Sequence, residues 1–458
     1  MTVRAITGLA ALNGAYGVLG IAILWAFRGL PRWVDALRLS GLGYLVGVAA
    51  FGVVWTQLLV LGVELNGWGV VFSLVGGIVV ACAAGVVLGR PMPRGYGDPG
   101  RRASSASILV TVSGVALTGL LLEALFRSAH LQSLQAYDAW AFWVPKAKAI
   151  YFFGGLDGQV FTTFPGPTYP PLVPILDATA FHAMGGADVV TFHLQYWFLV
   201  VGAVAAIAGC LYRPVPAWLL WPPLLLALVV PRVASGLLTP QADVLVDAFF
   251  VVGALLLALW LRDGRGWRLA AGATLFAGAG LTKREGLLFA ASAILVAFVA
   301  TLPRRKAVWL RLLAVAAVAG VAALPWRLWY RSHGIGGEAP ANVGAGGSFG
   351  RVGDSLRLSF DVFFDTTLWS VVPIVALIAL GAALVWGDRR LGGFLAAVLG
   401  LVFVGGAWVT YSYRGVPITS DEALNPIVRY TGAAVLLAAA ATPLLLASVW
   451  RSGTEEPR

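Results

Sequence analysis

A single carboxylate, Asp138, stands among aromatic residues in the stretch YDAWAFWVPKAKAIYFF (137–153), about a dozen residues after an apolar run. A carboxylate in apolar surroundings is partly desolvated, which favours its uptake of a proton and suits a general base. The alternative role is structural, because such a residue also pairs with a nearby lysine or caps a helix. The residues alone leave both roles open for Asp138.

Five cations near the ends of apolar runs form a second candidate group, and they are Lys146, Lys148, Lys283, Arg284 and Arg429. Cations at a membrane boundary attract the phosphate of a lipid headgroup, so these residues are predicted phosphate ligands. Two alternatives stay open. Lys146 and Lys148 are two apart, cannot share a helix face, and could each extend to a headgroup. In GLTKREGLLF (280–289), Glu285 could neutralise one cation of a solvated turn.

Acidic residues close to apolar runs are candidates for a supporting role. Asp243 and Asp247 in TPQADVLVDAFF (239–250) are four apart and share one helix face, with Lys283 or Arg284 as the expected partner. The alternative is a carboxylate that stabilises the start of a helix. Glu123, about one turn inside the preceding apolar run, could orient a basic group.

No metal or nucleotide motif is apparent. The four histidines lack metal-ligand spacing, and no C-x-x-C, Walker or G-x-G-x-x-G pattern stands in a suitable context. We therefore expect that no cofactor is required. A divalent metal is compatible with the acidic residues but is not indicated by them.

The elements that must position these residues are membrane helices. Of 458 residues, 59% are hydrophobic and 12% are charged, far from the composition of a soluble protein. The net charge of +11 fits basic loops at the ends of membrane spans. No basic stretch is interleaved with aromatics on a soluble segment, so nucleic-acid binding is not expected.

Taking about 20 apolar residues per span predicts an all-α polytopic membrane protein with about thirteen transmembrane helices. They are expected at 5–27, 38–63, 68–89, 106–126, 191–212, 216–232, 243–261, 268–282, 287–303, 307–326, 369–387, 391–412 and 428–450. The first is expected to be retained, since it lacks a signal-peptide cleavage site.

The distribution of basic residues predicts the orientation. An odd number of spans puts the termini on opposite sides, and most of the 32 basic residues fall on the side of the C-terminus. That side is predicted to be cytoplasmic, with the N-terminus outside. Three sizeable outer segments follow, 127–190, 327–368 and 413–427. The first is long and aromatic, and we expect interfacial helices and a proline-rich turn in it.

The order of several short motifs resembles the GT-C membrane glycosyltransferases, most of all the group with the protein O-mannosyltransferases and the lipid A aminoarabinose transferases. Besides the first-loop acid, the motifs are YPPL (169–172), ADVLVDAFF (242–250), TKREG (282–286), RRK (304–306), LPW (324–326) and RY (429–430). The resemblance covers 106–458, which is expected to be the glycosyltransferase membrane domain with its catalytic outer loop at 127–190. Residues 1–105 are expected to be extra N-terminal helices.

The resemblance implies a polyprenyl-phosphate-linked sugar as donor and a glycan, lipid or protein as acceptor, with transfer on the non-cytoplasmic face of the plasma (inner) membrane. Asp138 matches the first-loop catalytic acid, although Ala139 stands where the family often has a second acid, which weakens metal binding more than base catalysis. Lys283 matches the lysine of the TK motif and Arg429 the late arginine. Lys146 and Lys148 stand where first-loop phosphate contacts occur, and Tyr169 belongs to the proline turn.

A lipid-linked sugar transporter or flippase is the competing function, because it would also carry outer basic residues and many spans. Such proteins often show paired halves, and no internal repeat is apparent here. A membrane scaffold without activity would leave the outer charges unexplained.

Overall fold

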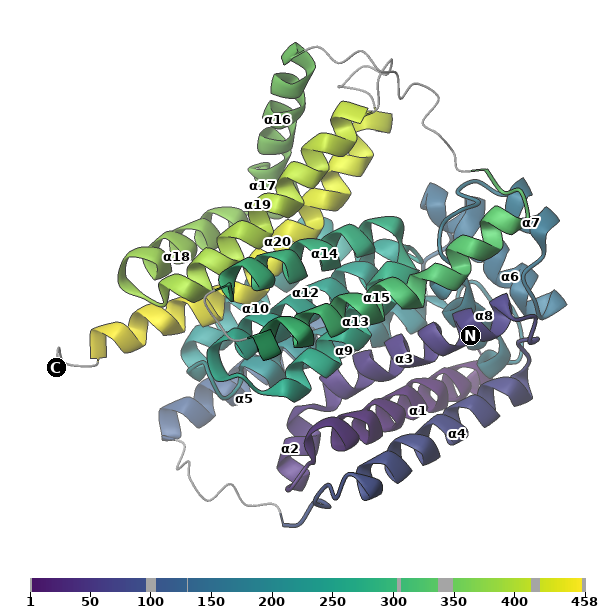
Figure 1. Ribbon diagram of the computed structural model, residues 1–458, viewed down its shortest axis with the longest axis horizontal. Coiled ribbons are helices and arrows are strands. Elements are labelled where there is room, and N and C mark those ends of the chain that lie inside the picture. Colours follow the sequence, from purple (N-terminus) through teal and green to yellow (C-terminus); the bar gives the residue numbers. More distant parts are fainter. Residues whose placement is uncertain are drawn as a thin grey trace.

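The computed structural model describes residues 2–95, 104–129, 131–302, 306–336, 349–412 and 421–454, and every regular element within these ranges is helical (Figure 1). The helices of the first half are α1 (Val3–Arg28), α2 (Trp33–Arg38), α3 (Ser40–Val60), α4 (Gly67–Val87), α5 (Ser105–Ala129), the π-helix η1 (Ala139–Trp143), α6 (Val144–Phe153), α7 (Gly158–Thr163), α8 (Leu172–Met184) and α9 (His193–Leu211). Those of the second half are α10 (Ala217–Leu228), α11 (Pro231–Gly236), α12 (Ala242–Asp263), α13 (Gly266–Thr282), α14 (Arg284–Ala300), α15 (Lys306–Ser332), α16 (Phe349–Phe363), α17 (Thr366–Trp369), α18 (Val372–Trp386), α19 (Arg389–Ser412) and α20 (Asp421–Thr454).

The polytopic, all-helical class is confirmed, whereas the count of thirteen spans is not. Within the described ranges nine helices are long and apolar enough to cross a membrane, or ten if the pair bent by 115° between Trp369 and Val372 counts as one span. Four predicted segments fall on shorter helices, α10, α13, α14 and α18. Helix α10 is bounded by two prolines. It begins directly after Pro216 and ends before Pro231, which is the first residue of α11. Between α13 and α14 the break falls at Lys283, whose backbone is extended.

The first two long helices cross at a contact made of glycines. A Cβ on Gly20 of α1 would lie 1.6 Å from the carbonyl oxygen of Gly43 in α3, and one on Gly47 would lie 1.9 Å from that of Tyr16. Small residues let membrane helices approach to backbone contact, where dispersion forces and weak hydrogen bonds hold them. The close crossing of α1 and α3 therefore depends on these glycines.

The N-terminal helices are joined to the rest by buried polar side chains. The Asn13 amide of α1 donates to Gln195 Oε1 of α9 at 2.9 Å, and the Tyr44 hydroxyl of α3 donates to Asn13 Oδ1 at 2.6 Å. Polar groups in an apolar interior need such partners. Residues on both sides of position 105 belong to one hydrophobic core, and the predicted domain boundary there stays a prediction.

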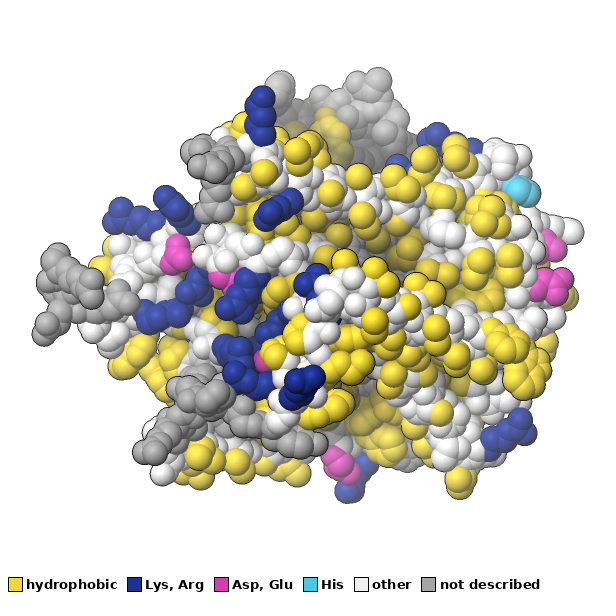
Figure 2. All heavy atoms as spheres, turned by 60° about the horizontal axis from the view of Figure 1, so that its bottom comes forward, with side chains coloured by type: hydrophobic (Ala, Val, Ile, Leu, Met, Phe, Trp, Pro, Cys, Tyr) yellow, Lys and Arg dark blue, Asp and Glu magenta, His cyan; other side chains and the backbone are white. Residues whose placement is uncertain are grey.

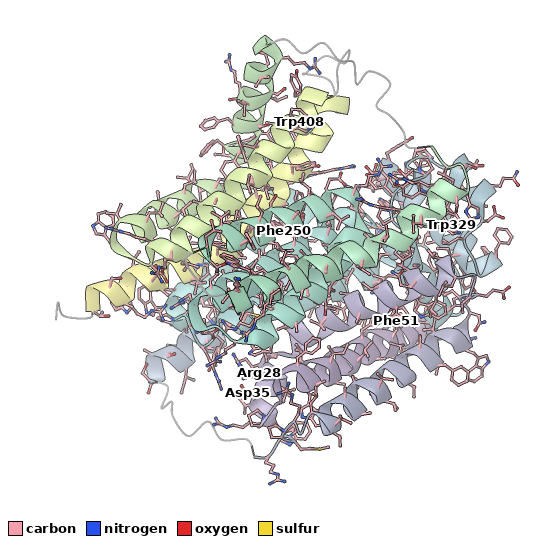
Figure 3. The ribbon with its side chains drawn as sticks, in the orientation of Figure 1. Arg28, Asp35, Phe51, Phe250, Trp329 and Trp408 are labelled. Carbon is pink, nitrogen blue, oxygen red and sulfur yellow. The ribbon has the colours of Figure 1, made fainter. Side chains whose placement is uncertain are left out.

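The figures show which parts of the chain lie at the two ends of the bundle. In Figure 1 the start of α1 and the end of α20 lie at opposite ends of it. Figure 3 places Arg28 and Asp35 at one end and Trp329 at the other, and Figure 2 shows basic side chains gathered on a surface otherwise spread with hydrophobic ones. The many apolar helices indicate a multi-pass membrane protein, and the assignment of each end to a side of the membrane stays a prediction.

The glycine crossing yields a stability prediction. We expect Gly20→Ala to lower the thermal midpoint of the protein in detergent, because its methyl group would meet the Gly43 carbonyl and force α1 and α3 apart, at a cost of about 1–3 kcal/mol. Gly17→Ala is the matched control, since a Cβ there meets no atom within 4 Å. Equal midpoints for the two variants would contradict the assigned packing.

Candidate functional site

A cavity of about 520 Å³ opens between α9, α10, α11, α12 and α20. This volume lies within the range of small-ligand sites, about 300–1,000 Å³. Charged and polar side chains line one part of it, and aliphatic side chains line the remainder.

The polar part surrounds the start of α12. Its ionisable members are Asp138, Arg232, Asp243, Asp247 and Arg429. The apolar part extends deeper, and among its residues are Val200, Val204 and Ile207 of α9, Leu224 of α10, and Leu436 and Ala440 of α20. Along α20 the lining runs from Arg429 to Pro443, which is about 20 Å of helix. The cavity is therefore a long apolar slot with a charged mouth.

Alternating charges connect the elements at this mouth. The guanidinium of Arg429 donates to Asp138 Oδ2. Its Nε atom also lies 3.5 Å from Asp243 Oδ2. The second oxygen of Asp243 accepts from Lys283 Nζ at 2.6 Å, and Glu285 Oε1 lies 3.8 Å from the same ammonium. The network thus joins the start of η1, α20, α12 and the junction of α13 with α14.

The local backbone explains how these side chains meet. Lys283 is extended (φ −154°, ψ 155°) between two helices, which turns its side chain towards α12. The turn is tight, because a Cβ on Gly286 would lie 2.0 Å from the carbonyl oxygen of Ala279. Asp138 precedes a π-helical turn, a distortion often found at functional sites. The TKREG motif therefore needs its glycine to place its lysine.

Opposing effects act on the Lys283 ammonium, whose side chain is only 3% exposed. Burial lowers its pKa, but the carboxylates of Asp243 and Glu285 outweigh burial and hold the pKa above its ordinary value. Lys283 is therefore a permanent cation at neutral pH. It is also the partner that the sequence analysis named for Asp243.

Tyr169 and Arg284 form a second layer next to the network. The Arg284 guanidinium lies 5.4 Å from the centre of the Tyr169 ring, a cation–π distance, and Phe142 stacks on that ring at 5.8 Å. Lys146 is buried behind this layer and donates to the carbonyls of Pro165 and Gly166, at 3.1 and 2.6 Å. It holds the proline-rich turn that carries Tyr169, so its contacts are those of a positioning residue.

Two of the other predicted site residues lie away from the cavity, and a third lines it but has no charged partner among the described residues. Lys148 is half-buried on α6 and does not line the cavity. Glu123 is exposed on α5, where it pairs with Arg127 one turn further along. Asp247 is buried, one turn after Asp243, and lines the cavity without an ion pair to any described residue. The fold therefore gathers Asp138, Asp243, Asp247, Lys283 and Arg429 around one mouth.

Arg232 lines the same mouth and was missed by the sequence analysis. Its signal was present, because it stands at the end of an apolar run, like Lys283 and Arg429. Trp369 was also missed, and it lies against Gly432 beside Asp247. Among the described residues no group of three His, Cys, Asp or Glu side chains could hold a metal ion.

The network yields a prediction about stability. We expect Lys283→Met to lower the thermal midpoint strongly, by about 3–5 kcal/mol in unfolding free energy, because Asp243 then keeps only Arg429 at the mouth. The double variant Asp243→Asn/Lys283→Met should recover part of the loss. Additive losses in thermal unfolding of the four proteins would contradict the coupling.

The sequence and fold were also compared with known proteins. No protein-family model matches the chain, and neither a curated protein nor a solved structure matches it. The cavity, the charges at its mouth and the order of the motifs are therefore the features that bear on function.

Proposed function

We propose that this protein transfers a sugar from a polyprenyl-phosphate donor to an acceptor hydroxyl, with inversion at the anomeric carbon. The observation that carries the proposal is the amphiphilic cavity, whose charged mouth continues into an aliphatic slot, with a lining along α20 that spans about 20 Å from Arg429 to Pro443. A polyprenyl phosphate has the same division into an anionic head and a long apolar chain. A polar soluble substrate would leave the slot unused.

The mouth suits a phosphodiester because its cations already bind anions. Arg429 holds two carboxylates, and Arg232 lines the same wall. A planar guanidinium also binds phosphate through paired hydrogen bonds. Lys283, fixed behind Asp243, adds positive potential without having to move. These groups would stabilise the negative charge that grows on the departing phosphate.

Asp138 is the proposed base. Its carboxylate accepts the proton of the acceptor hydroxyl as that oxygen bonds to the anomeric carbon, while the bond from this carbon to the phosphate oxygen breaks. The lipid phosphate leaves from the opposite face and takes the bonding electron pair. A positioned base contributes about 10² to 10⁴ in rate.

Arg429 couples the two halves of this scheme. Its ion pair with Asp138 occupies an oxygen of that carboxylate before the donor arrives. A donor phosphate bound to Arg429 would compete for the guanidinium and release the carboxylate. The base would then become available only beside a bound donor, which disfavours unproductive proton transfer.

The proposal includes a location and partners. The mouth is placed on the outer face of the plasma membrane, with the N-terminus outside and the C-terminus inside, following the bias of basic residues. The acceptor is a hydroxyl of a glycan, a lipid or a protein. The mechanism assigns no step to a metal or cofactor.

The base is tested with purified protein and radiolabelled polyprenyl-phosphate sugars in detergent. We expect Asp138→Asn to lower turnover about 100-fold or more, because the amide cannot accept the proton, while donor binding is retained. Arg429→Gln should lower turnover and, unlike Asp138→Asn, should also weaken donor binding. The exposed Arg389→Gln changes charge to the same extent at a distant surface and serves as control.

Unchanged turnover in Asp138→Asn would remove this residue from the mechanism. Movement of intact lipid-linked sugar across liposomes, without transfer from any donor, would instead establish the transporter.

The slot gives a separate prediction about the lipid chain. Ala203 lines it from α9, and we expect Ala203→Phe to lower turnover with long-chain donors about tenfold while short-chain donors are affected less, because the added ring blocks the slot beyond the mouth. Val201→Phe, on the same helix outside the lining, is the control. Equal losses for long and short donors would contradict a lipid-binding slot.

A further inference from the structure

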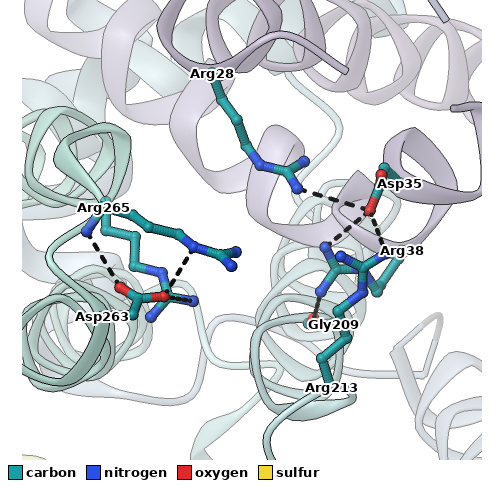
Figure 4. Close-up of polar contacts among 8 residues, drawn as sticks. Arg28, Asp35, Arg38, Gly209, Arg213, Asp263 and Arg265 are labelled. Atoms are coloured by element: carbon teal, nitrogen blue, oxygen red, sulfur yellow. Dashed lines mark hydrogen bonds and ion pairs between the residues drawn. The ribbon is translucent and has the colours of Figure 1, made fainter. Parts of the chain in front are cut away.

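A second group of charges, several of them buried, lies at the opposite end of α12 from the candidate site. Asp243 is near the start of this helix and Asp263 is its last residue, which separates the two by about 30 Å, the thickness of a bilayer core. Figure 4 shows Asp263 with Arg265, and across from them Asp35 with Arg28, Arg38 and Arg213. The proposed transfer reaction uses none of these residues.

Arginine outnumbers its partners in this group. Asp35, whose side chain is 4% exposed, lies 3.1 Å from both Arg38 and Arg213 and 3.8 Å from Arg28. Asp263 forms ion pairs with Arg265 at 3.2 Å and with Arg268 at 2.9 Å. Leaving Arg213 aside, four guanidinium groups share these two carboxylates within the described part of the chain. Arg28, Arg38 and Arg268 are at most 13% exposed, and buried charges are normally matched, so the excess of arginine points to an anion that this end of the bundle accommodates.

The arginines surround a cavity of about 220 Å³. Arg38, Arg213, Arg265 and Arg268 line it, together with Asp263 and the ring of Trp267. Trp267 also lies between two of the cations, 5.3 Å from Arg28 and 5.6 Å from Arg268, measured from the guanidinium carbon to the ring centre. The cavity has space and charge for a phosphate group.

Buried donors at this cavity have no acceptor within the described part of the chain. They are the Nε atoms of Arg38 and Arg268 and the indole Nε1 of Trp267, all on lining residues. A buried donor left unsatisfied costs about 1–3 kcal/mol. One tetrahedral anion offers several acceptor oxygens and could satisfy more than one of these donors at once.

We propose that this basic cavity binds the phosphate group of an anionic ligand on the membrane face opposite the candidate transferase site. The chemistry is shared by a phospholipid headgroup and a soluble phosphate. The neighbouring helix α2 favours the lipid, because Trp33 and Leu37 expose 49% and 77% of their surface next to Arg38. Exposed Trp and Leu beside buried arginines are typical of a helix at the lipid interface. The inference does not depend on the transferase activity.

The test measures thermal unfolding of the full chain in detergent while a ligand is titrated. One arm adds phosphatidylglycerol, with phosphatidylcholine as the neutral lipid, and the other adds inorganic pyrophosphate against chloride at equal ionic strength. A ligand that binds the folded protein raises the midpoint with concentration, which gives an apparent affinity. A shift with phosphatidylglycerol alone identifies the lipid, and a shift with pyrophosphate identifies a soluble phosphate.

The variants place the site. We expect Arg268→Gln and Arg265→Gln each to weaken the apparent affinity about tenfold, because each removes a charged donor from the cavity. Arg265 is 54% exposed, so its replacement leaves the fold intact even if Arg268→Gln unfolds. Arg389→Gln, an exposed arginine outside the cavity lining, should leave the affinity unchanged. No shift with either ligand, or equal shifts in all variants, would overturn the proposal.

Discussion

The ion pairs of Arg429 are the interaction on which the candidate site depends. One guanidinium holds Asp138, from the segment before η1, and Asp243, at the start of α12, although these residues are distant in the sequence. Lys283 fixes the other oxygen of Asp243 from a third element. Without this network four separate pieces of chain would bring isolated charges to the end of a hydrophobic bundle, at a high desolvation cost.

The same constraint shapes the cavity. On α12 the acidic side chains lie in the first two turns, at Asp243 and Asp247, and on α20 Arg429 lies near the start of the candidate span Ile427–Thr454, since deeper positions would be costly for an ionised group. Below them the lining changes to aliphatic residues such as Val204, Leu224 and Ala440. An amphiphilic cavity therefore follows from how a membrane bundle places charge, and its function depends on which side chains the mouth presents.

The features that could be predicted from the sequence are those that depend on composition and spacing. All thirteen apolar segments fall on helices, and Asp243 pairs with Lys283, because a carboxylate and a lysine at the ends of adjacent apolar runs have few other partners. The count of thirteen membrane spans is not confirmed, because hydropathy does not register how short α10, α13, α14 and α18 are. The contacts of Lys146 with two carbonyls were not foreseeable, since they depend on the path of the chain at 165–166. Arg232 could have been predicted in the same way as Arg429, because it is also a cation at the end of an apolar run.

The two ends of α12 handle charge in opposite ways, and the difference bears on what each end can do. At and just behind the mouth of the large cavity, Arg232, Lys283 and Arg429 face Asp138, Asp243 and Glu285, so an incoming anion must compete with carboxylates that are already there. Competition of this kind limits affinity and permits release, as turnover requires. At the other end the described arginines outnumber the two aspartates that they pair with, and an anion would complete the charge balance instead of disturbing it. A site with that balance suits a ligand that stays, so the two proposals assign substrate exchange and anion retention to opposite ends of one helix.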